Sequence, residues 1–342
     1  MGIGSQMPTV MELRRQYSCS QATLERALDR LRREGLIERP AGQLRLRVAA
    51  TADPAQYRIA LIRPDYPSPT FEELSRVIIR AGQARDCAFD LQSYRKLSGL
   101  ELHKTMRDVD GAILIPTSEV FPDHLCKALR RPHRPVVVIQ DPPAGLRVSS
   151  VRIDDEQIGR LAVEHLAGLG HRRILLLMSE PHSPSGNARA AGWRSAMTKL
   201  GQDDLESLII DPQLHPFDNS MLGTYDYFSN WLRGRHVDFT AVFCAAWTGA
   251  VAALRALREN DLPVPQRVSV IAHGGEGYMM PFLYPALTAV ETDIQRYGRR
   301  VIEVMQAHLQ NPGTIITDVV ESKVVVRETT ARRPAAVRPS GR

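Results

Sequence analysis

The chain has 342 residues, of which 43% are hydrophobic and 24% charged, so it is long enough for two or three domains with their own cores. Its net charge of +6 is concentrated at the ends: residues 1–50 carry nine arginines against five acidic residues, and residues 331–342 carry four arginines and no acid. The four cysteines are scattered, no apolar run approaches 18 residues, and no secretion signal starts the chain, which argues against a disulfide-framed, membrane-bound or secreted protein and predicts a cytoplasmic one with free thiols.

Two short helices are predicted near the N-terminus. Thr9 and Glu12 form a capping box for a helix that runs to about Tyr17. Ser20 is the expected N-cap of a second helix, which ends near Glu34 before a glycine. The apolar positions of this second helix recur at helical spacing and share one face: Leu24, Ala27, Leu28 and Leu31.

Two strands, Leu36–Arg39 and Leu44–Val48, follow these helices, so residues 1–48 are predicted to form a winged helix-turn-helix domain. In the second strand Arg45 and Arg47 alternate with apolar residues. One face of this strand therefore packs, and the arginine face can meet phosphate.

The runs from Met7 to Leu13 and from Ser20 to Glu38 resemble the winged-helix domain of the gluconate-repressor (GntR) family, above all in the order Ala-Leu, Arg-Leu and Glu-Gly-Leu-Ile-Glu. The resemblance implies double-stranded operator DNA as a partner. The second helix would enter the major groove, with Gln21, Thr23 and Arg26 nearest to bases and phosphates, while Arg45 and Arg47 contact the backbone.

This head departs from the GntR pattern in three ways. Met11 and Gln21 stand where the family usually has arginine, and Gly42 alone remains of a glycine-rich wing tip. Only six residues precede Met7, so the family's first helix has no counterpart and the domain looks truncated. Either the start codon is assigned too late or dimer partners cover a head that is marginally stable alone.

Residues 49–56 form a small and polar linker, and strands then alternate with helices along residues 57–330. This alternation predicts a doubly wound α/β body with parallel sheets and ligands at the carboxyl ends of strands. The predicted strands are 58–62, 112–115, 136–139, 173–178, 208–210, 241–244 and 268–271, and the predicted helices are 72–85, 157–169, 188–200 and 248–259.

Several runs of the body resemble the sensor domain of the lactose-repressor/galactose-repressor (LacI/GalR) family, a relative of periplasmic sugar-binding proteins. They lie in order at residues 155–174, 189–196, 241–257, 268–271 and 287–298. The resemblance implies two lobes, about 57–152 with 292–312 and 153–291 with 313–330, and three crossings near residues 152, 291 and 313. An effector would bind in the cleft between the lobes. Residues 331–342 are expected to be a disordered tail.

The LacI resemblance also indicates which residues face the effector. Arg189 would fork onto hydroxyls or a carboxylate, with a surface role at a helix start as the alternative. Asp141 follows a strand and is a ligand residue or a turn residue. The remaining candidates come from strand-to-helix loops and a crossing: Tyr66, Ser68, Phe71, Phe217, Asp218 and Thr292.

Three polar positions of the LacI pattern are changed in this chain. Ala246-Trp247 replaces an Asn-Asp pair, and His273 replaces an acidic residue. Trp247 could stack on a sugar face or an aromatic ligand, or it could fill a cleft that binds nothing. Carboxylates that would accept hydrogen bonds from sugar hydroxyls are therefore absent, so the expected effector is a sugar or a sugar-like metabolite and not necessarily a simple sugar.

No catalytic residue, cofactor or metal site is predicted. The sequence has no Ser-His-Asp order and no phosphate loop. His165 and His171 are interpreted as packing and turn residues, and residues 154–156 as a solvated lobe crossing.

The combined interpretation is a homodimeric, ligand-responsive transcription repressor. The alternative is a cytoplasmic small-molecule-binding protein whose degenerate head no longer binds DNA.

Overall fold

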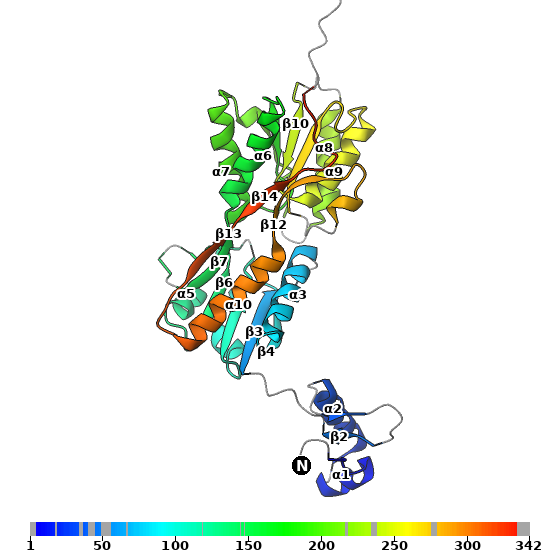
Figure 1. The fold of residues 1–342 in the computed structure, drawn as a ribbon, viewed down its shortest axis with the longest axis vertical. Coiled ribbons are helices and arrows are strands. Elements are labelled where there is room, and N and C mark those ends of the chain that lie inside the picture. The colour runs from blue at the N-terminus through cyan, green and yellow to red at the C-terminus, as the bar shows by residue number, and fades with distance from the viewer. Residues whose placement is uncertain are drawn as a thin grey trace, which may run out of the picture. The chain divides into compact units, whose positions relative to one another are not determined.

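The computed structural model describes residues 5–17, 19–33, 37–39, 45–48, 56–65, 68–117, 119–143, 145–146, 148–215, 218–233, 238–274 and 279–333. The chain separates into two units, one of Met1–Tyr57 with Asp86–Ala88 and one of Arg58–Arg85 with Phe89–Arg342 (Figure 1). The first unit contains the head, and its boundary residues Tyr57, Cys87 and Ala88 also begin two strands of the body, which holds the rest.

The head contains two helices and a two-stranded antiparallel sheet: α1 (Val10–Tyr17), α2 (Gln21–Arg33), β1 (Ile37–Glu38) and β2 (Arg47–Val48). Both predicted caps are present. The Thr9 backbone N–H donates to Glu12 Oε2 over 2.6 Å, and the Glu12 N–H donates to Thr9 Oγ1 over 3.3 Å. The Thr23 N–H donates to Ser20 Oγ over 3.2 Å. These local bonds fix where each helix begins.

The head has a small apolar core. Its buried members come from both helices and both sides of the wing: Leu13, Leu24, Leu28, Ile37 and Leu46. Ala27, predicted on the apolar face, is exposed, because the head's core lies against the Leu24–Leu28 side of the helix. The wing strands are two residues each, shorter than predicted, and Gly42 and Leu44 lie outside the described residues.

The first lobe of the body is built on a six-stranded sheet in the order β13-β7-β6-β5-β3-β4. The strands are β3 (Tyr57–Pro64), β4 (Cys87–Tyr94), β5 (Gly111–Leu114), β6 (Val136–Ile139), β7 (Ser149–Ile153) and β13 (Thr317–Val320). Helices α3 (Pro69–Gln83) and α10 (Ile294–Gln310) pack together on the sheet, and α4 (Leu102–Thr105) and α5 (Asp123–Arg130) pack together around a second cluster of apolar residues. The sequence predicted β3, β5, β6 and α3 of this lobe. It did not predict strands β4, β7 and β13 or helices α4, α5 and α10.

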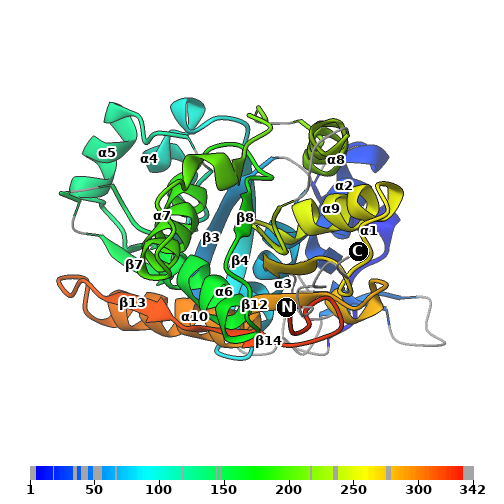
Figure 2. The same ribbon diagram turned by 90° about the horizontal axis from the view of Figure 1, so that it is seen from above.

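The second lobe has a six-stranded sheet in the order β14-β12-β11-β10-β8-β9. Its strands are β8 (Ile174–Leu177), β9 (Ile209–Ile210), β10 (Ala241–Cys244), β11 (Ser269–His273), β12 (Thr288–Thr292) and β14 (Ser322–Val325). Helices α6 (Asp155–Gly168) and α7 (Pro184–Lys199) lie on one side, and α8 (Ser220–Leu232) and α9 (Trp247–Glu259) on the other (Figures 1 and 2). The pairing of β14 with β12 is antiparallel, so this sheet is not purely parallel as predicted.

Helices α6 and α7 contact each other through glycines. A Cβ on Gly159 would lie 2.0 Å from the Arg189 carbonyl oxygen, and one on Gly192 would lie 1.9 Å from the Glu156 carbonyl oxygen. The two backbones therefore touch at both points, and no side chain fits between them. This contact fixes the position of Arg189 relative to the start of α6.

Three chain crossings connect the lobes. The chain passes from β7 to α6 at Asp154, from β12 to α10 at Asp293, and from β13 to β14 at Glu321. The third crossing was predicted near residue 313. That prediction is wrong, because residues 317–320 pair with β7 and extend the first sheet by one strand.

The segment after β14 is held against the second lobe by hydrogen bonds. His171 Nε2 bonds to the Ala331 carbonyl oxygen over 3.0 Å, and His165 Nε2 bonds to Thr330 Oγ1 over 3.1 Å. The Arg333 N–H donates to the Leu169 carbonyl over 2.9 Å. The expected disorder of the tail from residue 331 is therefore wrong for residues 331–333, and residues 334–342 lie outside the described part of the chain.

Candidate functional sites

The exposed face of α2 carries the predicted base-reading residues. Gln21 Nε2 donates to Glu25 Oε1 over 2.9 Å, Thr23 Oγ1 lies 2.8 Å from Ser20 Oγ, and Arg26 Nε donates to the Ala22 carbonyl over 3.3 Å. All three side chains are exposed and bond only within their own helix in these contacts. Such bonds are weak in water, so DNA can replace them at small cost.

The wing arginines differ in their surroundings. Arg45 is exposed. Arg47 is half-buried, and its Nε donates to Glu38 Oε1 over 2.9 Å across the strand pair. An exposed ion pair of this kind contributes at most about 1 kcal/mol, so a phosphate can compete with Glu38 for the guanidinium.

Arg189 lies in the second turn of α7 and is almost covered. Its Nε donates to Asp155 Oδ1 over 2.7 Å and its Nη1 donates to the Ala245 carbonyl over 2.9 Å, while its side chain is 11% exposed. It is therefore a fixed guanidinium between the start of α6 and the end of β10, not a loose surface arginine. The helix begins at Pro184, earlier than the predicted Ala188, because Ser183 caps it by accepting from the Gly186 N–H.

Asp155 belongs to the candidate site through its ion pair with Arg189, a role that the sequence did not indicate. It was placed in a solvated crossing, but its side chain is 13% exposed and paired with Arg189. Its neighbour Asp154 caps α6 by accepting from the Gln157 N–H over 2.9 Å. The available signal was an acidic residue at the start of a helix that directly follows a strand.

Trp247 and His273 follow β10 and end β11, two neighbouring strands. Trp247 is 7% exposed, and a Cβ on Gly274 would lie 3.4 Å from its Cδ1, so the indole packs beside the end of β11. Burial, together with the nearby charge of Arg189, holds the pKa of His273 well below its ordinary value. The imidazole is therefore neutral at pH 7. Since Nδ1 lies 3.3 Å from the Val290 carbonyl, which can only accept, Nε2 is the acceptor nitrogen.

The first-lobe candidates are held differently. Asp141 is 69% exposed and forms an ion pair with Arg152 over 3.1 Å. Ser68 caps α3 by accepting from the Phe71 N–H over 3.4 Å, and Phe71 is half-buried. No bond among the described residues joins this group to Arg189, Trp247 or His273. Tyr66 lies outside the described residues.

Two other predicted residues have described bonds to partners other than Arg189. Thr292 Oγ1 lies 2.7 Å from Ser322 Oγ, so this threonine joins the second and third crossings to each other. Asp218 is exposed and its Oδ2 accepts from the His215 N–H over 2.8 Å. Phe217 lies outside the described residues.

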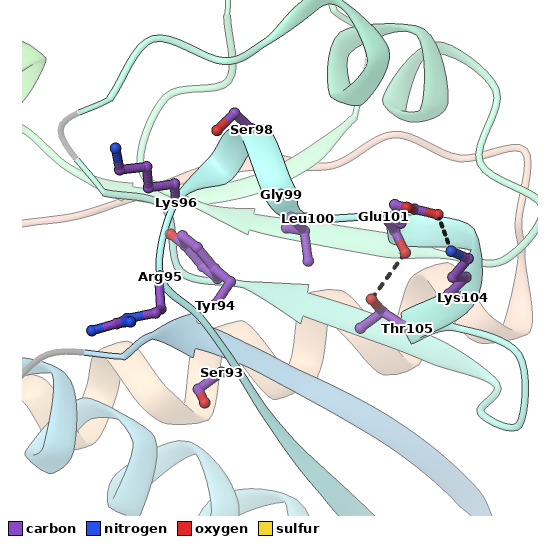
Figure 3. Close-up of a pocket in the computed structure, with 10 residues that line it drawn as sticks. All are labelled: Ser93, Tyr94, Arg95, Lys96, Ser98, Gly99, Leu100, Glu101, Lys104 and Thr105. Carbon is purple, nitrogen blue, oxygen red and sulfur yellow. Dashed lines mark hydrogen bonds and ion pairs between the residues drawn. The ribbon is translucent and has the colours of Figure 1, made fainter.

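A cavity of about 930 Å³ opens in the first lobe at the carboxyl end of β4, a place the sequence analysis did not find (Figure 3). Its rim includes the exposed cations Arg95 and Lys96 and the ion pair of Lys104 with Glu101, at 2.7 Å. The bond from Lys104 lowers the pKa of Glu101. In Figure 3 the side chains of Arg95 and Lys96 point away from the Glu101–Lys104 pair, so these charges do not converge on one point.

Comparison with known proteins finds matches for both parts of the chain. Residues 163–330 match the periplasmic binding protein-like domain, and residues 1–43 match the gntR family of bacterial regulatory proteins. The transcriptional regulator MalR of Streptomyces coelicolor is 26% identical over 287 residues, 81% of each chain, and the repressor PurR of Haemophilus influenzae is 26% identical over 254 residues, 72% of each.

Solved structures agree with these matches. A LacI family transcriptional regulator from Enterococcus faecium with bound ribose is 26% identical, covers 81% of this chain and all of its own, and superposes with a TM-score of 0.68. The body of the chain is thus similar to LacI family transcriptional regulators, and its head is similar to the gntR family. A CelR–cellobiose complex, 22% identical, shares the regulator's fold with a TM-score of 0.67 and covers 94% of this chain and all of its own.

Within its described residues the regulator has no helix that is both long and apolar enough to cross a membrane. The same residues contain no group of three or more His, Cys, Asp or Glu side chains arranged to hold a metal ion.

Proposed function

We propose that the protein is a cytoplasmic homodimeric repressor that binds operator DNA through the head and a sugar or sugar-like metabolite between the lobes of the body. Binding, with no catalysis, is the proposed role of the body. The observation that carries the proposal is the fixed Arg189–Asp155 pair beside Trp247 and His273 at the carboxyl edge of the second sheet.

The topology supports an effector position between the lobes. The carboxyl end of β7 leads directly into the second lobe and that of β12 into the first, so the carboxyl edge of each sheet borders the other lobe. Ligands of doubly wound sheets bind at these edges.

The side chains at this edge favour a ring that carries hydroxyl groups. Two nitrogens of Arg189 bond to Asp155 and Ala245, and its Nη2 has no bond to a described residue, so it can donate to a ligand oxygen. Nε2 of the neutral His273 accepts a hydrogen bond from a hydroxyl. The Trp247 indole offers an apolar face to a ring. Asp141, Ser68, Phe71, Tyr66, Phe217, Asp218 and Thr292 remain proposed contacts.

A thermal-shift screen of sugars, sugar acids and aromatic metabolites tests the effector site. An effector at 100 times its Kd stabilises by about 2.7 kcal/mol, which raises the melting temperature by several degrees. In Arg189→Gln that shift should be lost. Arg194→Gln, on the same helix but paired with exposed Glu206, is the matched control and should keep it. An equal shift in both variants would contradict the assignment of Arg189.

Binding of the head is tested with the DNA directly upstream of the gene. The affinity should fall steeply with salt, and Arg47→Ala should reduce the slope of log K against log salt by about one. Gln21→Ala should instead change which sequence binds best. If no fragment is retained at low salt, the alternative of a ligand-binding protein with an inactive head is correct.

A further inference from the structure

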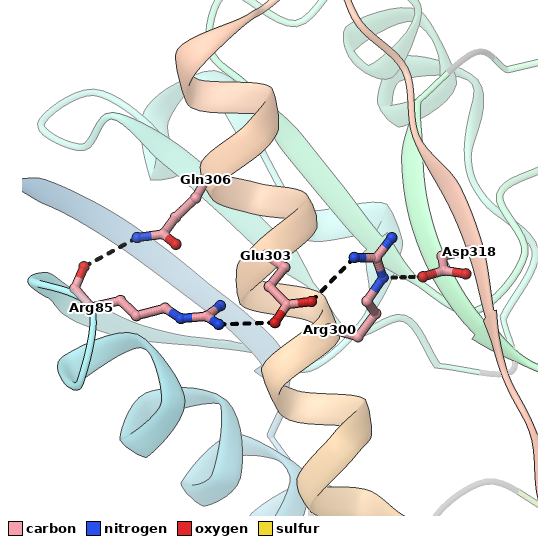
Figure 4. A network of polar contacts seen from close by, with 5 residues as sticks. All are labelled: Arg85, Arg300, Glu303, Gln306 and Asp318. Carbon is pink, nitrogen blue, oxygen red and sulfur yellow. Dashed lines mark hydrogen bonds and ion pairs between the residues drawn. The ribbon is translucent and has the colours of Figure 1, made fainter.

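Four charged residues of the first lobe form one continuous chain of ion pairs, which we call the relay (Figure 4). Arg85 Nη2 donates to Glu303 Oε1 over 2.9 Å, and Arg300 Nη1 donates to Glu303 Oε2 over 3.1 Å. Arg300 Nε donates to Asp318 Oδ2. The relay thus begins after α3, crosses the surface of α10 and ends in β13.

Each end of the relay lies at a junction of the chain. Asp318 is two residues before the end of β13, where the third crossing to the second lobe begins. Arg85 directly precedes Asp86, whose carbonyl accepts from the N–H of Tyr57 over 3.3 Å. Tyr57 is the first residue of β3, where the chain coming from residues 49–56 joins the first lobe. Gln306 Nε2 also donates to the Arg85 carbonyl over 3.1 Å.

Packing of the helices does not explain the relay. Helices α3 and α10 already meet closely, since a Cβ on Gly298 would lie 2.4 Å from Val77 Cγ1 and one on Gly82 would lie 3.1 Å from Ile302 Cδ1. What the relay adds is a bond to β13. Among the described strands, β13 is the edge strand of the first sheet and pairs with β7 alone, and Asp318 gives it a second attachment, to α10.

The charges of the relay reinforce one another. The bond from Arg85 lowers the pKa of Glu303, and bonds from Asp318 and then Glu303 raise the pKa of Arg300. The side chains are 31–42% exposed. A single pair at that exposure contributes little, whereas a network of shared partners is held more firmly.

We propose that Arg85, Glu303, Arg300 and Asp318 are positioning residues that tie the third lobe crossing to the junction at Tyr57, so that a movement of the lobes is passed to the segment leading to the head. The inference deepens the proposed function, on which it rests: it names the route by which an effector between the lobes changes the placement of the head.

Hydrogen exchange of the full-length protein tests the relay without an effector or DNA. Asp318→Asn should raise the exchange rate of the Tyr57 amide by about fivefold, although Asp318 has no described bond to residues 56–57 or 86–88. Asp318→Glu, which keeps the carboxylate, should restore slow exchange. Glu206→Gln, which neutralises a carboxylate paired with Arg194 in the second lobe, should leave the Tyr57 amide unchanged.

The effect of salt on exchange at Tyr57 distinguishes an electrostatic role of the relay from a role in packing, because salt screens ion pairs but leaves apolar contacts in place. In about 1 M salt, where the Debye length is about 3 Å, exchange at Tyr57 in the unsubstituted protein should approach that of Asp318→Asn. Faster exchange confined to β13 and α10, with Tyr57 unchanged, would show that the relay only braces the first lobe and would overturn the proposal. If Asp318→Asn lowers the overall melting temperature, Glu303→Gln decides the same question from the middle of the relay.

A second measurement separates this inference from the proposed function. Asp318→Asn should bind the upstream DNA fragment about fivefold more weakly than the unsubstituted protein, and Glu206→Gln should bind it equally well. If the unsubstituted protein retains no fragment, the proposed function fails, while the exchange experiment still decides whether the relay reaches Tyr57.

Discussion

The head and the body are stabilised in different ways. Among the described residues, five buried apolar side chains form the core of the head, and its helices begin at hydrogen bonds between residues three apart in sequence. In the described part of the second lobe alone, 36 buried residues from strands and helices far apart in sequence form one core. The head is therefore defined by local sequence signals, and its free energy of unfolding is small. The body instead depends on close contacts between segments that are distant in sequence.

The largest expected effect is a separate loss of the head. Leu28→Ala removes a buried side chain from the small apolar core of the head, which costs about 2–5 kcal/mol, enough to unfold so small a domain. Calorimetry and hydrogen exchange of the full-length protein should show an unprotected head and an unchanged melting temperature of the body. The exposed Ala27→Gln is the control and should leave both unchanged. If the head stays protected from exchange in Leu28→Ala, the claim that its small core makes it less stable than the body is contradicted.

Close backbone contact in the body gives the next largest effect. In Gly159→Ala the new methyl group would overlap the Arg189 carbonyl, so α6 and α7 must separate at a cost of about 3 kcal/mol. The body should melt several degrees lower and lose effector binding, because Arg189 moves away from Asp155. Gly168→Ala lies in the same helix with nothing within 4 Å of its Cβ and should be neutral or slightly stabilising. Equal melting temperatures for the two variants would contradict the contact.

The features that could be predicted from the sequence are those that depend on local signals, and the features that were missed depend mostly on long-range contacts. The caps at Thr9 and Ser20 were predicted because a capping box is a pattern within four residues. The strands 136–139 and 241–244 were predicted with correct bounds because short, wholly apolar runs mark buried parallel strands. The start of α7 was missed although Ser183-Pro184 is a local signal for a cap followed by proline at the first position.

The remaining errors concern long-range contacts. Asp155 resembles its acidic neighbours in sequence, and only the fold shows that Arg189, 34 residues later, covers it. Strand β13 is short and partly exposed, so its pairing with β7, and with it the position of the third crossing, is not visible from residues 313–320 alone. Whether the predicted effector residues of the first lobe act together with Arg189 remains a proposal for the same reason.

The stability of the body should depend on pH more than that of the head, although the effect is smaller than those above. Burial lowers the pKa of His171, and likewise of His165 and His308, below the ordinary value of 6.5. As the pH falls below about 6.5 the unfolded chain takes up protons that the folded body resists, so the stability present above that pH is lost on acidification. Residues 1–57 contain no histidine. Between pH 7.5 and 5.5 the body should therefore melt a few degrees lower, while protection of the head stays constant.

His171→Gln checks the source of this pH dependence. The amide can still hydrogen-bond toward the Ala331 carbonyl but does not titrate, so the fall in melting temperature should be smaller than in the unsubstituted protein. An unchanged slope would show that His171 is not among the groups that resist protonation.

Repression controlled by an effector is the central claim, and one titration tests it most directly. The full-length protein is bound to a labelled fragment of its upstream DNA, and the compound that raises the melting temperature of the body in the screen is added, in parallel with Arg189→Gln. The account predicts that this compound changes DNA affinity at least fivefold in the unsubstituted protein and not in the variant. DNA affinity that is the same with and without the compound, although the compound binds, would contradict it.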